Sequence, residues 1–509
     1  MGRGSAPKAG TAQPPHDDVG PLVVSGRRSL KCIRQAGEMG IGGSEEVKPF
    51  DLGAQRGLQH FRRRQVPLLE LVVEVVGEVH LQPRHTPNYT PIRLGFDKLV
   101  NYDRAQRQKG STKMSSNGIR DKVAIVGMGC TPFGEHWGKD VDDLLVDATE
   151  ECFRTSGIGK DQIDAFWLGT MGSGVSGLTL SRPLKIDYKP VTRLENMCAT
   201  GSEAFRNACY AVACGAYDMV MAVGVEKLKD SGFSGLVSAA PPADGTHPTI
   251  TAPATFSLLA PAYGHKYGVN EEDMKEVMTR IAWKNHKNGA LNPRAQFKKE
   301  VGKDVICNSP LVAGPLGIFD CSGVSDGAAC AIIVRAEDAH KYTDKPLFVK
   351  ALSFTAGPAF GPMDPDYDYT TFTEVSKCAE DAYQQAGVTD PRSQLAMAEV
   401  HDCFTPTELV LMEDLSFAER GTAWKEVLAG TFDLDGDLPV NPDGGLKSFG
   451  HPIGASGLRM LFECWLQLRG EAPPERQIKT NRTLGLTHNL GGQPGACVSF
   501  ISIWGTELG

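Results

Sequence analysis

The sequence predicts an α/β fold, because runs of continuous apolar residues alternate along the chain with stretches of helical periodicity. Continuous apolarity is typical of strands that are covered on both faces, and strand–helix alternation is typical of parallel sheets. The expected strands cover residues 123–127, 165–169, 219–225, 329–334, 347–353, 398–401 and 496–503. The expected helices cover residues 141–156, 202–214, 272–287, 371–386, 406–418 and 456–469. We therefore expect an α/β architecture with mainly parallel sheets.

Composition excludes several classes of protein. The 509 residues contain no uncharged apolar run as long as the ~18 residues of a membrane span, so no membrane span is expected. A net charge of −8 argues against binding nucleic acid by bulk charge, and no nucleic-acid partner is expected. The 13 cysteines contain no C-x-x-C pair. We therefore expect reduced thiols in a cytoplasmic protein.

The chain divides into segments of different character. Residues 1–113 hold 18 Lys and Arg against 11 Asp and Glu, are rich in Gly and Pro, and lack a secretory-signal pattern. We expect residues 1–118 to be a poorly ordered or non-native extension, with a small accessory domain as the alternative. Residues 231–318 are polar, rich in Pro and Gly, and predict an inserted loop domain. The remaining parts form an N-terminal half over 119–230 and 319–345 and a C-terminal half over 346–509.

A weak internal sequence similarity relates the two halves. One half runs from Cys198 through a Gly-Ser pair and a helix to a strand that ends at Val225. The other runs from His451 through Gly-Ala-Ser-Gly and a helix to a strand that ends at Ile503. This pattern suggests a duplicated fold.

Cys198 is the first candidate for chemistry. It stands just before an expected helix, where Gly201 and Ser202 suit a tight turn and a helix cap. Backbone N–H groups and the positive end of the helix dipole favour a thiolate and supply donors for an oxyanion. The alternative is a small buried structural cysteine.

His401 and Cys403 lie two residues apart, between an expected strand and a helix that begins near Thr405-Pro406. Residues at i and i+2 of an extended segment share a side, so both can face one cleft at the carboxyl end of a strand. A chance pair is the alternative, and two ligands are too few to argue for a metal site.

Two glycine-dense segments complete the candidate site. His451 lies in Gly445–Gly457, next to Pro452, and is a candidate general base or oxyanion donor. The segment 487–496, which contains Gly491, predicts a turn whose N–H groups could hold an anion. A simple turn is the alternative for this second segment. The set of a nucleophile, bases, a second thiol and two glycine turns is typical of acyl transfer through an enzyme thioester.

In this order, these segments resemble the thiolase superfamily over residues 119–509. The Cys-Ala-Thr-Gly-Ser-Glu-Ala motif at Cys198 resembles the acylated nucleophile, and Gly-His-Pro-Ile-Gly around His451 resembles the signature of the activating histidine. The His-Asp-Cys-Phe box at His401 and the segment 284–297 resemble the sterol carrier protein type. Ser322 resembles a serine that contacts the pantetheine arm. The resemblance implies a duplicated α/β/α/β/α layered fold with an inserted loop domain.

The resemblance also implies a reaction and its participants. His451 would activate Cys198 for attack on a 3-ketoacyl-CoA, and His401 would help to hold the enolate-side oxygen. The N–H groups of Cys198 and Gly491 would hold the thioester oxygen. Most thiolases carry a second catalytic cysteine in a late Cys-x-Gly turn, where this chain has His488-Asn-Leu-Gly. The resemblance therefore assigns the second acid/base to Cys403. Acyl-CoA and CoA are the expected partners, with CoA as a substrate. No other cofactor and no metal are expected, and the expected assembly is a homodimer or homotetramer.

Three other functions compete with this one. The first is a dinucleotide-dependent dehydrogenase, because the run Gly172–Gly177 matches the G-x-G-x-x-G fingerprint, although Pro183 and Pro190 interrupt the helix that should come after it. A thiolase-like aldolase for lipid or steroid CoA esters and a non-catalytic lipid-binding protein are both expected to lose the nucleophile, which this chain keeps.

Overall fold

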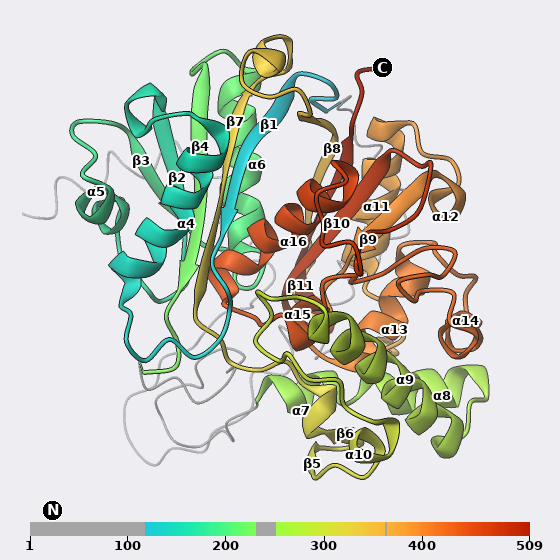
Figure 1. Ribbon diagram of the computed structural model, residues 1–509. Coiled ribbons are helices and arrows are strands. Elements are labelled where there is room, and N and C mark those ends of the chain that lie inside the picture. Colours follow the sequence, from blue (N-terminus) through green and yellow to red (C-terminus); the bar gives the residue numbers. More distant parts are fainter. Residues whose placement is uncertain (1–117, 231–250, 362–363) are drawn as a thin grey trace, which may run out of the picture. The chain divides into compact units, whose positions relative to one another are not determined.

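The computed structural model describes residues 118–230, 251–361 and 364–509 (Figure 1). All but the last residue of the expected extension over 1–118 lies outside the described residues, as does the 231–250 part of the expected loop domain. The described residues belong to one compact unit, Gln106–Gly509. None of their helices is long and apolar enough to cross a membrane.

A nine-stranded sheet forms the framework of this unit, in the order β3-β2-β4-β7-β1-β8-β11-β10-β9. Its strands are β1 (Val123–Cys130), β2 (Ala165–Gly169), β3 (Val191–Leu194), β4 (Met219–Glu226), β7 (Gly327–Arg335), β8 (Leu347–Ala356), β9 (Leu395–Glu399), β10 (Leu484–Gln493) and β11 (Ala496–Gly505). A separate pair joins β5 (Leu311–Ala313) to β6 (Leu316–Gly317).

The expectation of mainly parallel sheets is wrong. Only β2–β3, β2–β4 and β9–β10 are parallel pairs in the described sheet. The last strand of each half enters between two earlier strands and runs against both of them: β7 lies between β4 and β1, and β11 lies between β10 and β8. An antiparallel pair, β1–β8, then joins the two halves.

The two halves repeat one topology. Strands β1, β2, β4 and β7 have the same chain order and sheet order as β8, β9, β10 and β11. The place of β3 is taken in the second half by Val440, which forms a parallel bridge to Ala398 of β9. This arrangement agrees with the internal similarity in the sequence, and it gives the segments around Cys198 and His451 equivalent places in the two halves.

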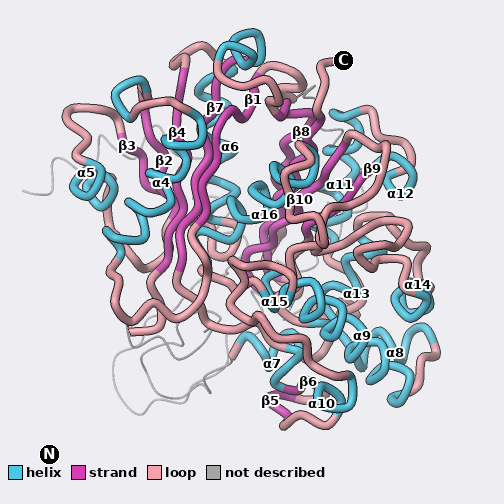
Figure 2. The backbone as a smooth tube through the Cα atoms, in the orientation of Figure 1, coloured by secondary structure: helices cyan, strands magenta, loops and turns pink. Residues whose placement is uncertain are grey.

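Helices cover the sheet on its outer faces and fill the space between its halves. They are α4 (Val141–Ser156), α5 (Leu178–Leu184), α6 (Thr200–Ala213), α7 (Ala252–Phe256), α8 (Leu259–Tyr267), α9 (Glu271–Ala290), α10 (Lys303–Cys307), α11 (Thr373–Ala386), α12 (Pro391–Gln394), α13 (Thr405–Asp414), α14 (Ala423–Ala429), α15 (Gly445–Ser448) and α16 (Ile453–Leu468). Helices α6 and α16 pack against each other, and Figure 2 shows α16 between the two groups of strands.

Alternating side chains of the strands explain this layering. Val123 and Ile125 of β1 belong to the apolar cluster that includes residues of α6 and α16. Their neighbour Ala124 belongs to a second cluster that includes Leu144 and Leu145 of α4. Because successive side chains of a strand point to opposite faces, each strand needs helices on both sides. The structure therefore has the α/β/α/β/α layers expected from the resemblance.

The insertion is more regular than expected. Four helices, α7 to α10, lie within 251–318; α9 agrees with the helix expected over 272–287, whereas the other three were not expected. The longest, α9, begins where the side chain of Asn270 accepts a hydrogen bond from the N–H of Asp273. It buries Val277 and Ile281 in the cluster that also contains residues of α13. Residues of α7 and α8 belong to the same cluster, so tertiary packing stabilises helices that the Pro and Gly content concealed.

Candidate active site

Cys198 lies in a tight turn between β3 and α6. Met197 has a left-handed backbone, with φ of 51°, which reverses the chain just before the nucleophile. The Thr200 hydroxyl clamps this turn, because it accepts from the N–H of Asn196 at 2.9 Å and donates to the carbonyl of Met197 at 2.5 Å. The helix begins at Thr200, and Ala199 is its N-cap, so Gly201 and Ser202 are not the cap that the sequence predicts.

His451 lies at the equivalent turn of the second half, between α15 and α16. Its N–H donates to the Ser325 hydroxyl at 2.9 Å. Gly450 has φ of 121°, and a Cβ there would lie 2.7 Å from that same hydroxyl. The turn therefore requires glycine, for its backbone conformation and for its lack of a side chain.

Small residues bring Cys198 and His451 together. A Cβ on Gly201 of α6 would lie 2.6 Å from the carbonyl oxygen of Gly454 in α16, and one on Gly457 would overlap Ser202. The first turns of the two helices therefore approach to backbone contact. A sulfur atom and a ring nitrogen placed at these two helix starts consequently face the same space.

His401 and Cys403 follow β9 and are buried. The rings of His401 and His451 are perpendicular, with centroids 5.4 Å apart and an interplanar angle of 82°. The Cys198 sulfur and one nitrogen from each of these rings lie within 4.8 Å of one another. Charge on Cys198 contributes to raising the pKa of Cys403, after the larger effect of burial, so the second thiol borders the same site.

Asp402 fixes the loop that carries these two residues. Its carboxylate accepts hydrogen bonds from the N–H of Leu446 at 2.6 Å, from the N–H of Lys447 at 3.3 Å and from the Asn285 side chain at 2.8 Å. It thereby ties the His401 loop to α15, which leads to His451, and to α9 of the insertion. Burial, and then the charge of Glu408, raise the pKa of Asp402 to about 7.

A serine hydroxyl fixes the tautomer of His451. Ser456 Oγ lies 2.7 Å from His451 Nδ1 and donates its only proton to the carbonyl of Pro452 at 2.9 Å. The serine therefore accepts from His451 Nδ1–H, and the lone pair of the ring is on Nε2. This atom is buried and has no partner among the described residues. Burial, and then the charge of Arg459, lower the pKa of His451 to about 3, so the ring is a neutral base.

The resting thiol differs from the expected thiolate. Burial, followed by the charges of Glu195 and Glu226, raises the pKa of Cys198 to about 12. Proximity to a helix N-terminus therefore does not lower this pKa, because the cost of burying a charge is larger. The site rests as a neutral thiol beside neutral imidazoles, and burial also holds the pKa of His401 well below its usual value.

Gly491 lies beside the nucleophile, but in a strand instead of the expected turn. Strand β10 pairs through this segment with β11, and the turn comes only at Pro494 and Gly495. A Cβ on Gly491 would overlap the carbonyl oxygen of Asn196 and lie 3.2 Å from the N–H nitrogen of Ala199. Glycine is therefore needed here so that the strand can approach the Cys198 turn.

Ser322 lies next to the His401 loop. Its N–H donates to the carbonyl of Cys403 at 2.9 Å, and the backbone of Cys321 forms an isolated antiparallel β-bridge with that of Phe404. Its hydroxyl is buried and has no hydrogen-bond partner in 118–230, 251–361 or 364–509. The chain returning from the insertion thus brings an available hydroxyl to the second thiol.

Glu226 occupies the backbone donors of the glycine loop after β2. Its carboxylate accepts from the N–H groups of Met171, Gly172 and Ser173 at 2.9–3.0 Å and from that of Gly454 at 3.1 Å. The Gly172–Gly177 run therefore does not offer these donors to a pyrophosphate, which argues against dinucleotide binding. Glu226 also connects this loop to α16.

Sequence reasoning missed Glu226, Ser456 and Thr200. The only signal for Glu226 is an acidic residue at the end of a strand of eight buried residues.

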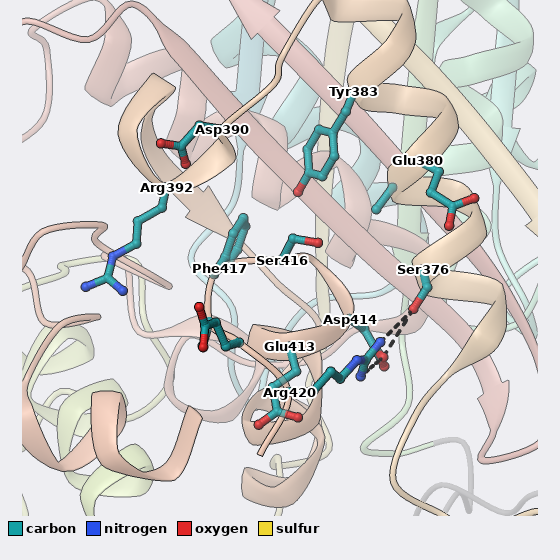
Figure 3. A pocket seen from close by; sticks show the side chains of 13 residues that line it. Ser376, Glu380, Tyr383, Asp390, Arg392, Glu413, Asp414, Ser416, Phe417 and Arg420 are labelled. Carbon is teal, nitrogen blue, oxygen red and sulfur yellow. Dashed lines mark hydrogen bonds and ion pairs between the residues drawn. The ribbon is translucent and has the colours of Figure 1, made fainter. Parts of the chain in front are cut away.

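A pocket of about 520 Å³ on the C-terminal half lies apart from this candidate site (Figure 3). Its Arg420 is paired with Asp414 at 2.6 Å, and the four predicted catalytic side chains do not line it.

Comparisons with known proteins agree with this geometry. Residues 123–337 match the description "Thiolase, N-terminal domain", and residues 363–502 match "Thiolase C-terminal domain-like". The chain is 35% identical over 392 residues to acetyl-CoA acetyltransferase of Methanothermobacter thermautotrophicus, covering 75% of this chain and 99% of that protein. It is 30% identical over 399 residues to sterol carrier protein 2 of Bos taurus, covering 74% of this chain and 71% of that protein.

A solved structure described as an Ltp2-ChsH2(DUF35) aldolase has the same fold. It superposes with a TM-score of 0.64 at 24% identity, covering 76% of this chain and 98% of that chain. The paired cysteine and histidine turns, the layered duplicated sheet and the sequence similarity over almost the full length of an acetyltransferase lead to one conclusion. The chain belongs to the thiolase family.

Proposed function

We propose that the chain is a thiolase that transfers acyl groups between CoA thioesters through an acyl-Cys198 intermediate. It would cleave a 3-ketoacyl-CoA with CoA to an acyl-CoA and acetyl-CoA, or run the reverse Claisen condensation. The observation that carries the proposal is the group formed by the Cys198 sulfur and the ring nitrogens of His401 and His451, all within 4.8 Å. Similarity to acetyl-CoA acetyltransferases supports the same chemistry.

The first half-reaction acylates Cys198. The free Nε2 of His451 takes the thiol proton as the sulfur attacks the 3-keto carbon. The C2–C3 bond then breaks, and the electron pair leaves as the enolate of acetyl-CoA. Because both groups start neutral, charge develops only as the substrate reacts, where surrounding donors stabilise it most.

The second thiol completes the reaction. Cys403 protonates C2 of the enolate and becomes a thiolate. This thiolate takes the proton of an incoming CoA thiol, whose sulfur attacks the acyl group on Cys198. The Cys198 sulfur leaves and recovers its proton from Nε2 of His451, so that every group returns to its starting state.

Hydrogen-bond donors stabilise two oxygen atoms during these steps. On the enolate side, His401 and the newly protonated His451 donate to the thioester oxygen of the leaving acetyl-CoA. On the acyl side, the N–H groups of Cys198 and Gly491 donate to the oxygen of the tetrahedral intermediate. The close approach of Gly491 to the Cys198 turn supports this second role.

We also propose an oligomeric assembly and a reducing compartment for the protein. Among the described residues β3 pairs only with β2, and this edge, together with the exposed Val175 and Leu178 nearby, supports a homodimer or homotetramer. All 12 cysteines of the described residues are free, which supports a reducing compartment such as the cytoplasm. Ser322 would contact the pantetheine arm of the substrate.

An aldolase for lipid or steroid CoA esters is the competing function. It needs neither an acylated cysteine nor a second thiol that acts as acid and base. The presence of Cys198, Cys403 and both histidines around one space therefore favours the thiolase.

Mass spectrometry after mixing the protein with a panel of 3-ketoacyl-CoA esters tests the proposal. We expect an acyl adduct on the peptide that contains Cys198. The Cys198→Ala protein should show neither adduct nor thiolysis, whereas the surface variant Cys214→Ala should keep both. Thiolysis at an unchanged rate by folded Cys198→Ala would refute the proposal, and cleavage of a CoA ester without any adduct would favour the aldolase.

A further inference from the structure

Three donor atoms of the site have the chemistry of a zinc site. Cys198 offers sulfur, and His401 and His451 each offer a ring nitrogen, all within 4.8 Å of one another. Zinc binds thiolate at about 2.3 Å and imidazole at about 2.0–2.1 Å, which places tetrahedral ligands roughly 3.5 Å apart. The three side chains therefore need to close by only about 1 Å to bind one ion.

His451 is held in a form suited to metal binding. A metal-bound histidine normally donates its second ring N–H to a fixed acceptor, which orients the ring. His451 already has this arrangement, because Nδ1–H donates to Ser456 and leaves the lone pair of Nε2 directed away from that bond. Both histidines are 1% exposed, and each has a ring nitrogen without a partner among the described residues.

We propose that Cys198, His401 and His451 form a zinc-binding site, and that zinc reversibly inhibits the protein. Three protein ligands leave a fourth position for water. On binding, Zn²⁺ loses water ligands, the S–H bond of Cys198 breaks, a Zn–S bond forms and the proton goes to solvent. No oxidation or reduction takes place.

The inhibition follows from the identity of the ligands and rests on the proposed function. A zinc-bound sulfur cannot attack a carbonyl carbon, and a zinc-bound Nε2 cannot take a proton. Sulfur and imidazole donors favour zinc over magnesium or calcium, which prefer oxygen. The site would therefore respond to zinc in the presence of ordinary concentrations of magnesium.

Cobalt substitution tests binding without any reference to activity. Co²⁺ added to metal-free full-length protein should bind one ion per chain and produce thiolate-to-cobalt charge-transfer bands and tetrahedral d–d bands, both of which Zn²⁺ abolishes. Cys198→Ser should lose the charge-transfer bands, and His401→Ala should weaken binding about 10-fold or more. The double variant Cys214→Ser/Cys307→Ser removes two exposed thiols and should leave both sets of bands unchanged.

Two results would overturn the proposal. One is charge-transfer bands that persist in folded Cys198→Ser, and the other is bands that disappear in Cys214→Ser/Cys307→Ser. In the activity arm, Zn²⁺ should inhibit thiolysis, EDTA should restore it, and Mg²⁺ should have no effect. If the chain proves not to be a thiolase, the cobalt spectra still decide whether the metal site exists.

Discussion

Ser456 should control the basicity of His451. In Ser456→Ala, the buried Nδ1–H of His451 loses its acceptor at 2.7 Å, and Ala at this position supplies no other. An unsatisfied buried donor costs about 1–3 kcal/mol, so the ring shifts toward the tautomer that carries its proton on Nε2 and cannot accept one from Cys198. This free energy corresponds to a fall of about 5- to 150-fold in the rate of Cys198 acylation.

Pre-steady-state acylation by a 3-ketoacyl-CoA measures this rate directly. Thr149→Val is a matched control, because the Thr149 hydroxyl also donates to the carbonyl four residues earlier, at 2.8 Å, in a buried position of α4 with no histidine beside it. Both variants lose one buried hydroxyl, but only Ser456→Ala should slow acylation. An unchanged acylation rate in folded Ser456→Ala would refute the tautomer argument.

Four further predictions address the surroundings of the site. Glu226→Gln places an amide NH₂ among N–H donors and should lower the free energy of unfolding by about 1–3 kcal/mol in urea titrations, whereas the exposed Glu195→Gln should not. Gly491→Ala forces a Cβ against Asn196 and should reduce kcat even at temperatures where the variant remains folded. A kcat equal to that of the native protein would contradict this. Burial, and then the charge of Lys447, lower the pKa of His286 to about 3, so the native protein loses stability as the pH falls from about 6.5 toward about 3. Between neutral pH and about pH 4.5, urea titrations of His286→Phe should therefore show a loss in the free energy of unfolding that is about 2–3 kcal/mol smaller than that of the native protein. A chain that starts at Met114 should keep thiolysis and an unchanged Tm, and loss of folding would show instead that the first 113 residues are an integral domain.

Local sequence patterns were sufficient for several elements. Helix α4 and strand β2 have the predicted bounds, 141–156 and 165–169. For α4 the reason is local, because Asp140 and Asp143 form a capping box at its start and Gly157 adopts φ of 70° at its end. The strand expected at 398–401 is β9, Leu395–Glu399, so its start was predicted three residues too late and its end two residues too late.

Other features depend on residues far apart in the chain. The segment 487–496 contains three glycines and predicts a turn, yet pairing with β11 and β9 makes most of it a strand. The short strand β3 also escaped prediction, because its four residues carry little apolar signal and are stabilised by parallel pairing with β2. In both cases the neighbouring strand supplies the hydrogen bonds that local composition does not predict.

The sequence by itself determined the α/β class and the candidate nucleophile, bases and second thiol, because these depend on residue type, spacing and periodicity, while its resemblance to thiolases implied the layered, duplicated fold. Only the tertiary structure decided how these groups meet and in what charge state. The 5.4 Å separation of the histidine rings, the tautomer of His451 and the raised pKa of Cys198 all depend on neighbours distant in sequence and on exclusion of water. Burial energies and hydrogen-bond partners belong to the packed chain, so no local pattern can specify them.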